Sequence, residues 1–232
     1  MHVTTPRKIA AEAVGTALLV AAVVGSGIMA QRLATDPAVA LLANTLATGG
    51  ALVAILLVFG PISGAHLNPA VTLALAASKE IAPQLAAGYI VAQIGGGIVG
   101  AVTANAMFDL PLVSWSEHVR AGFPQLLSEG IATFGLLGVV ITVRRSRAAA
   151  TPFAVAAYII GAYWFTASTS FANPAVAIAR AFSNTYAGIR PIDIGGFVAA
   201  QLGGAAVGSA FFMWLVGTGA ATPARRRVCR RW

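Results

Sequence analysis

Long stretches of the chain carry no charged residue, and short polar segments separate them. A helix needs roughly 20 apolar residues to cross the hydrocarbon core of a bilayer, and most of these stretches reach that length. Glu129 is the one charge that interrupts any of them. The stretches are 13–31, 37–78, 81–108, 121–143, 148–179 and 194–224.

Two of these stretches do not fit a single span. Residues 37–78 are too long for one helix and too short for two full helices with a loop, and residues 148–179 are again over-long. We therefore predict a full span and a shorter apolar element in each. The fold class expected is an all-α membrane protein with six transmembrane helices and two re-entrant half-helices.

Composition supports the membrane class. Hydrophobic residues make up 58% of the chain, the mean hydropathy is +0.81, and charged residues are 9%, against about 25% in a typical soluble domain. A soluble fold cannot cover its surface with so few charges. The single cysteine, Cys229, excludes an internal disulfide and a cysteine-rich metal site.

The net charge of +8 comes from residues beside the spans. Basic residues next to spans mark the cytoplasmic side of a membrane protein, so we expect both termini in the cytoplasm and no nucleic-acid partner. Most of the basic residues fall in four groups: Arg7 and Lys8; Lys79; Arg144, Arg145 and Arg147; and Arg225, Arg226, Arg227, Arg230 and Arg231.

Three landmarks recur in the same order in the two halves of the chain. Each half holds three spans, and an odd number inserts the second half upside down, as in many channels and transporters. We therefore predict one transmembrane channel domain over 1–232, with repeats at about 9–108 and 124–217 and a basic cytoplasmic tail at 218–232. The landmark pairs are Glu12 to Thr16 with Glu129 to Thr133, Asn68-Pro69-Ala70 with Asn173-Pro174-Ala175, and Gln93-Ile94-Gly95-Gly96 with Gln201-Leu202-Gly203-Gly204.

Each Asn-Pro-Ala triplet has the chemistry of a helix start. Asparagine is a good N-cap, and proline at the first helical position loses no hydrogen bond. We expect half-helices at about 68–78 and 173–183 whose N-termini meet near the midplane. The partial positive charge of the two N-termini and the two asparagine amides would hold the oxygen of a water or hydroxyl compound and disfavour cations.

These motifs resemble the aquaporin, or major intrinsic protein, family. The resemblance rests on 63–72 (Ser-Gly-Ala-His-Leu-Asn-Pro-Ala-Val-Thr), on the second triplet, and on the paired glutamates and Gln-Gly-Gly segments. It covers roughly residues 9–217. It implies six helices, two half-helices, a pore in every subunit and a homotetramer.

The sequence departs from the family where most members have arginine directly after the second triplet, because Val176 stands there. The resemblance carries three further filter positions over by spacing: Thr48, Gly161 and Ser170. An extra residue in the loop 168–172 would move the last two to Ile160 and Phe171. Thr48, Gly161 and Val176 are small, so we expect a wide, apolar filter, as in a bacterial subgroup associated with arsenic resistance.

Four titratable residues need separate interpretation. We expect Glu12 and Glu129 to accept hydrogen bonds from the half-helix loops rather than relay protons, although intramembrane carboxylates are functional candidates. His66 is expected to line the cytoplasmic mouth. For Arg180 the favoured interpretation is a rim arginine that reaches the interface or pairs with Asp193, and the alternative is a guard of the outer vestibule.

The function expected is a passive channel for small uncharged solutes: glycerol-sized polyols, metalloid hydroxides such as arsenous acid, and water. The alternatives are a water-selective aquaporin and, less favoured, an ion-coupled secondary transporter. No catalytic residue, metal site or cofactor is expected. The partners are the solutes, the lipid bilayer and other copies of the chain, in the plasma or inner membrane.

Overall fold

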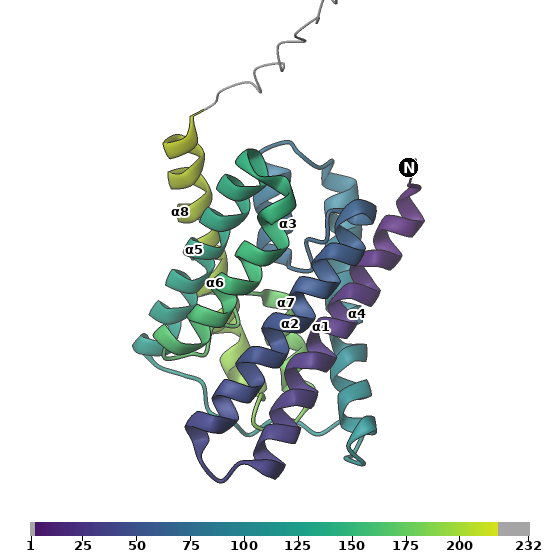
Figure 1. Ribbon diagram of the computed structural model, residues 1–232, viewed down its shortest axis with the longest axis vertical. Helices are drawn as coiled ribbons and strands as arrows, with labels where there is room; N and C mark the ends of the chain where they lie inside the picture. The colour runs from purple at the N-terminus through teal and green to yellow at the C-terminus, as the bar shows by residue number, and fades with distance from the viewer. Residues whose placement is uncertain (1–2, 218–232) are drawn as a thin grey trace, which may run out of the picture.

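The computed structural model describes residues 3–217, and six of its helical segments are long and apolar enough to cross a membrane. The predicted fold class is confirmed (Figure 1). The six are α1 (Thr5–Leu33), α2 (Pro37–Ser63), α4 (Pro83–Met107), α5 (Phe123–Ser146), α6 (Thr151–Phe165), which the short 3-10 helix η1 (Ala148–Ala150) precedes, and α8 (Ile194–Val216), which η3 (Pro191–Asp193) precedes. The predicted tail at 218–232, and the end of the predicted last span, lie outside the described residues.

Two shorter helices occupy the places predicted for half-helices. They are α3 (Pro69–Ala77) and α7 (Pro174–Ala179), the latter continued by the 3-10 helix η2 (Arg180–Phe182). Proline stands at one of the first two positions of every helix from α1 to α7, where its fixed φ suits a helix start and its missing N–H is no loss. These prolines therefore mark where the helices begin.

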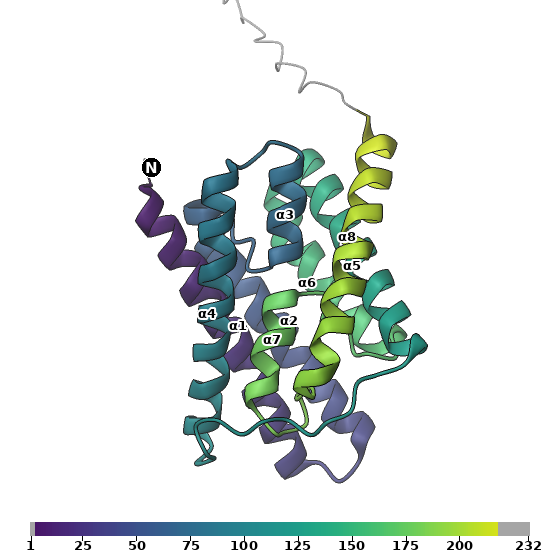
Figure 2. The ribbon, with the colours of Figure 1, turned by 180° about the vertical axis from the view of Figure 1, so that it is seen from behind.

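The two half-helices lie in opposite halves of the bundle. In Figures 1 and 2, α3 lies toward the end that holds the N-terminus and the last turn of α8, called here the N-terminal end, while α7 lies toward the other end, called here the far end. Their first residues point toward each other in the middle of the molecule. Neither half-helix crosses the bundle alone, and the loop that leads to each one returns from the same end of the bundle to the middle.

Glycines allow the long helices to pack closely in equivalent pairs. A Cβ at Gly96 of α4 would collide with the backbone oxygen of Ala13 in α1, and a Cβ at Gly204 of α8 would collide with the backbone oxygen of Gly130 in α5. Small residues at such crossings let two backbones approach within a membrane. The pairs α1·α4 and α5·α8 therefore have the same construction, as expected from the repeated Gln-Gly-Gly segments.

The segment 108–122 runs across the far end of the bundle between α4 and α5 (Figure 2). Its backbone bonds to the segment that follows α7: Ser116 N donates to Ala181 O at 2.9 Å, and Arg190 N donates to His118 O at 2.9 Å. These bonds hold the loop against the end of the half-helix, and so bring its side chains close to the middle of the far face.

Candidate functional site: a pore between two half-helices

The two loops that lead into the half-helices have the same strained backbone. In the first, Ala65 and Leu67 have φ values of 45° and 51°, and in the second, Ser170 and Ala172 have φ values of 50° and 47°. Left-handed backbone costs a residue with a side chain roughly 1–2 kcal/mol. The loops therefore need strong external contacts to keep this shape.

Glu12 supplies those contacts for the first loop. It is fully buried on α1, and its two carboxylate oxygens accept four hydrogen bonds. The donors are Ser63 Oγ at 2.6 Å, His66 N at 3.0 Å, Leu67 N at 2.7 Å and Gln93 Nε2 at 2.8 Å.

Glu129 has the equivalent role for the second loop, and the expected bonds from both loops to both glutamates are present. It is also fully buried. Its donors are Ser168 Oγ at 2.5 Å, Phe171 N at 2.9 Å, Ala172 N at 2.9 Å and Gln201 Nε2 at 2.6 Å. The repeated Gln-Gly-Gly segments thus carry a polar contact as well as a helix crossing.

The two asparagines cap their own helices and join the two halves. Asn68 Oδ1 accepts from Ala70 N at 2.8 Å, and Asn173 Oδ1 accepts from Ala175 N at 3.0 Å, as N-caps do. Each Nδ2 donates across the centre, Asn68 to Ala172 O and Asn173 to Leu67 O, both at 2.8 Å. An asparagine amide has two N–H donors, so one on each side chain remains for a solute.

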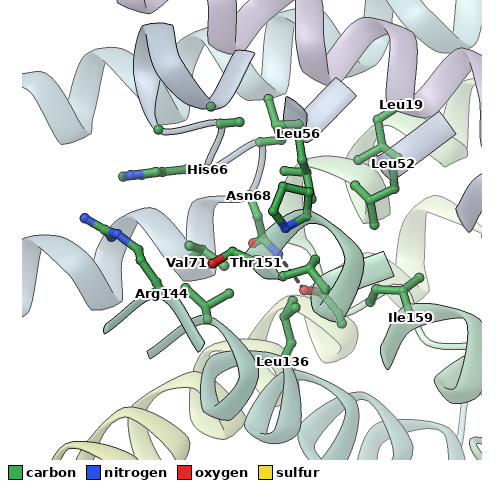
Figure 3. A pocket seen from close by; sticks show the side chains of 18 of the residues that line it. Leu19, Leu52, Leu56, His66, Asn68, Val71, Leu136, Arg144, Thr151 and Ile159 are labelled. Atoms are coloured by element: carbon green, nitrogen blue, oxygen red, sulfur yellow. Dashed lines mark hydrogen bonds between the residues drawn. The ribbon is translucent and has the colours of Figure 1, made fainter. Parts of the chain in front are cut away.

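A cavity of about 510 Å³ extends from the N-terminal end to this centre (Figure 3). Arg144, Thr151 and His66 line its outer part, and Asn68 and Val71 line it near the half-helix. Most of the remaining wall is aliphatic. Among the residues that line it, these aliphatic side chains come from the long helices: Leu19, Val23, Leu52, Leu56, Leu136, Val140, Val155 and Ile159.

His66 lies on this cavity wall, as predicted for the mouth of the pore. Its Nδ1 is 3.2 Å from Thr72 Oγ1, and its ring meets the ring of Tyr89 edge-on with centroids 5.3 Å apart. The imidazole is therefore held in place by one polar and one aromatic neighbour.

Two of the four predicted filter residues line the inner part of the cavity, and two do not. Thr48 and Val176 are buried and belong to its wall. The assignment of Gly161 to the filter is wrong, because Gly161 is exposed and a Cβ there would meet nothing within 4 Å. On α6 the wall residues are Val155, Ile159 and Tyr163, which recur at helical spacing on one face, while Gly161 lies on the other.

Tyr163 therefore takes the place that spacing gave to Gly161. It is buried, and its hydroxyl lies 3.4 Å from Thr48 Oγ1. The fallback position Ile160 is also wrong, because its side chain packs against Gly49 of α2 instead of lining the cavity. Spacing from the second triplet did not predict which face of α6 turns toward the cavity.

The second loop contributes Phe171 to the wall, not Ser170. Phe171 lines the cavity, whereas Ser170 is buried away from it with an Oγ that has no partner. The expectation that all filter residues are small is therefore corrected. Two aromatic side chains, Tyr163 and Phe171, stand beside Thr48 and Val176.

Arg180 is not a rim arginine, and it does not pair with Asp193. It is 3% exposed, its Nε donates to Ala187 O, and its guanidinium carbon lies 3.4 Å from the centre of the Phe171 ring. Asp193 instead pairs with Arg190, at 3.0 Å. The structure thus encloses Arg180 behind Phe171, a residue of the cavity wall.

Arg120 was not identified from the sequence, and it lies beside the same ring. It comes from the loop 108–122, is 7% exposed, and its guanidinium carbon is 4.9 Å from the Phe171 ring centre. A lone arginine in a polar loop gives no signal of burial. Only the backbone bonds that hold this loop against the end of α7 bring the side chain inward.

His118, in the same loop, lies within the electrostatic field of Arg120 and Arg180. Partial burial lowers the pKa of His118 below its usual value of 6.5, and the positive charges of Arg120 and Arg180 lower that pKa further. Both effects disfavour the imidazolium form. The far mouth is therefore a region of positive potential in which His118 is neutral at pH 7.

Comparison with known proteins agrees with this geometry. The family model described as "Major intrinsic protein" matches residues 1–172. The chain is 54% identical over 210 residues to the protein named aquaglyceroporin AqpS from Rhizobium meliloti (strain 1021), covering 90% of each chain. It is 29% identical to aquaporin Z from Bradyrhizobium diazoefficiens, covering 90% of this chain and 93% of that protein.

The fold also matches a solved structure. The X-ray structure of the aquaglyceroporin from Plasmodium falciparum superposes with a TM-score of 0.75 and 19% sequence identity, covering 92% of this chain and 97% of that one. At that identity the likeness concerns the fold alone. It supports the arrangement of six spans and two half-helices described above.

Proposed function

This chain belongs to the major intrinsic protein family of multi-pass membrane channels for water and small solutes, and on that premise we propose that it passively conducts glycerol-sized polyols, neutral metalloid hydroxides such as arsenous acid, and water. The observation that carries the proposal is the cavity between the half-helices. Among the described residues that line it, Arg144 at the mouth is the only one with a formal charge.

The wall chemistry favours a neutral solute with both hydroxyl and carbon surface. Asn68, Thr48 and Tyr163 offer polar atoms along an otherwise aliphatic wall. A buried ion would lose several kcal/mol of hydration in such a place without compensating partners, whereas a polyol can bond to the few polar groups. The name of the 54% identical relative, an aquaglyceroporin, supports the same solute class.

The filter residues act on the size of the solute in opposite directions. Val176 removes a donor and a charge from the wall, which favours solutes larger than water. Tyr163 and Phe171 add bulk that a filter of small residues would lack. We therefore propose Thr48, Tyr163, Phe171 and Val176 as the residues that select solutes, with His66 at one mouth and Arg180 at the other.

A permeability panel tests the proposal. Purified full-length protein in proteoliposomes is subjected to stopped-flow light scattering with water, glycerol, urea and arsenous acid. We expect permeation of glycerol and arsenous acid that does not saturate at low concentration. Water permeation without either solute would instead establish the water-selective alternative, which the two aromatic wall residues favour.

The ion-coupled transporter remains the alternative from a different class. It needs titratable groups that exchange protons or ions with the pathway, and Glu12 and Glu129 each already accept four hydrogen bonds. Accumulation of solute against its gradient when a proton gradient is imposed would contradict the channel proposal.

The cellular arrangement forms part of the same proposal. The basic residues at the N-terminal end, including Arg144, which pairs with Glu80 at 3.0 Å, support a cytoplasmic location for that end and for both termini. We propose one channel domain per chain, a homotetramer in the inner membrane, no enzymatic activity, no cofactor and no nucleic-acid partner.

A further inference from the structure

Arg180 has hydrogen-bonding capacity that the protein does not use. Its guanidinium is stacked on Phe171, and its Nε donates to Ala187 O. The two Nη atoms donate to no acceptor among residues 3–217, and neither is a fully buried polar atom without a hydrogen-bond partner. Each Nη atom therefore keeps a small accessible surface and unused N–H donors, although the side chain as a whole is only 3% exposed.

Arg120 places a second cation beside the first, and its position is fixed. Its Nε donates to Gly188 O at 2.8 Å and its Nη1 donates to Ser168 O at 3.0 Å. Its backbone N donates to Asp193 Oδ2 at 2.8 Å. These bonds leave Arg120 little freedom to turn toward solvent, so its charge stays next to Arg180.

Among the described residues, no carboxylate forms an ion pair with Arg120 or Arg180. The carboxylate of Glu129, on α5, braces the second loop, and its two oxygens already accept hydrogen bonds from four donors in that loop and α8. Asp193 forms its ion pair with Arg190. Two buried guanidinium groups against one engaged carboxylate leave a net positive charge of about one, which is costly to hold away from water without a counter-ion.

We propose that Arg180, supported by Arg120, forms a binding site for one small monovalent anion at the far mouth of the pore. The ligand class is a halide, nitrate or a small carboxylate, held by the free Nη donors of Arg180 and attracted by both charges. The Nη donors of Arg180 make no bond to the described residues, whereas each nitrogen of the Arg120 guanidinium already donates to a carbonyl oxygen. The net charge is about one, so a single monovalent ion satisfies the site. The site does not depend on which neutral solute the channel conducts.

The direct test uses bromide as the probe on the unmodified full chain. Crystals grown or soaked in sodium bromide are measured at the bromine absorption edge. We expect an anomalous peak within hydrogen-bonding distance of the Arg180 Nη atoms. Bromide peaks found only elsewhere on the molecule, or none at all, would overturn the proposal.

A solution measurement separates the two arginines from the remaining positive charge. Bromide-81 line broadening is followed in detergent-solubilised protein as a function of bromide concentration, for the parent chain, Arg180→Met and Arg180→Lys. Because a hydrogen bond to a charged group is worth about 1.5–3 kcal/mol, we expect Arg180→Met to weaken binding by about tenfold or more. Arg180→Lys keeps the charge but has different donors, and should lose less.

Arg32→Met is the matched control. Arg32 is an exposed arginine at the same end of the molecule, and its Nη2 donates to Phe108 O. The Arg32→Met variant should give the same bromide titration as the parent chain. Equal broadening in Arg180→Met and in the parent chain would refute the site. Neither measurement depends on solute flux, so failure here is distinguishable from failure of the channel proposal.

Discussion

At the scale of single residues, the pore wall is decided by a few side chains, of which the sequence predicted Thr48 and, in the place of the family's arginine, Val176. It lines the cavity directly above the second half-helix start, close to where Phe171 meets Arg180. An isopropyl group there neither donates a hydrogen bond nor repels a cation, so the wall at this point selects by size and apolar contact alone.

Val176→Arg should therefore narrow the pore and discriminate against the larger solute. We expect glycerol permeability to fall by about tenfold, which corresponds to about 1.4 kcal/mol in the barrier, with a smaller fall for water. Stopped-flow scattering of both solutes measures the ratio, and Val176→Ala serves as a neutral control. A glycerol-to-water ratio that is the same in Val176→Arg and the parent would show that this position does not select.

Tyr163 is the wall residue that replaces the expected Gly161. Removing its ring in Tyr163→Ala should widen the pore beside Thr48 and raise glycerol permeability several-fold. Gly161→Ala is the matched control, because a Cβ at that exposed position meets nothing within 4 Å and should leave both permeabilities unchanged. If Gly161→Ala changed glycerol permeability and Tyr163→Ala did not, the filter position on α6 would be Gly161, as the spacing predicted.

At the scale of elements, the half-helix loops depend on buried carboxylates. Glu129→Gln replaces two acceptor oxygens by one oxygen and a donor amide, which faces Phe171 N, Ala172 N or Gln201 Nε2. An unsatisfied buried group costs about 1–3 kcal/mol. We expect lower thermal stability in detergent and reduced flux through distortion of the second loop.

The control for that change is Glu117→Gln, an exposed carboxylate on the loop 108–122. Thermal unfolding followed by size-exclusion chromatography compares the two variants with the parent chain. Glu12→Gln should behave like Glu129→Gln because it has the same four kinds of donor. Parent-like unfolding of both buried variants would contradict the bracing role.

The helix pairs are held at a distance that only glycine permits. In Gly96→Ala the new methyl group collides with the backbone oxygen of Ala13, which must push α1 and α4 apart at a cost of about 1–3 kcal/mol. Gly95→Ala, the adjacent residue in the sequence, meets nothing within 4 Å. We expect lower thermal stability only in the first variant, and equal stability of the two would show that the crossing tolerates a wider spacing.

At the scale of the whole molecule, the two ends of the bundle carry different charges although the two halves of the chain repeat. The N-terminal end carries Arg144 and Lys79, and the far end carries Glu117 and the enclosed arginines. Cysteines placed at Lys79 and at Glu117, in a chain whose Cys229 is replaced by serine, report their side. A membrane-impermeant maleimide applied to intact cells should label only the cysteine at 117, and labelling of only the cysteine at 79 would invert the proposed topology.

Much of this molecule follows from the sequence alone, for reasons that are local. Uncharged stretches long enough to cross a bilayer define the spans, and asparagine followed by proline defines the start of each half-helix. The repeated glutamates predict the bracing of the two loops, because the uncharged stretches offer no Asp, Lys or Arg as a partner for a proton relay. These inferences need only the lengths of segments and the preferences of single residues.

The tertiary structure alone decided what surrounds the solute. The rotation of α6 about its own axis places Tyr163 rather than Gly161 in the wall, since a difference of two residues turns a side chain to the opposite face of a helix. The packing of the loop 108–122 on the end of α7 brings Arg120 next to Arg180 and Phe171. Neither arrangement has a local signal, because both depend on contacts between segments that are far apart in the chain.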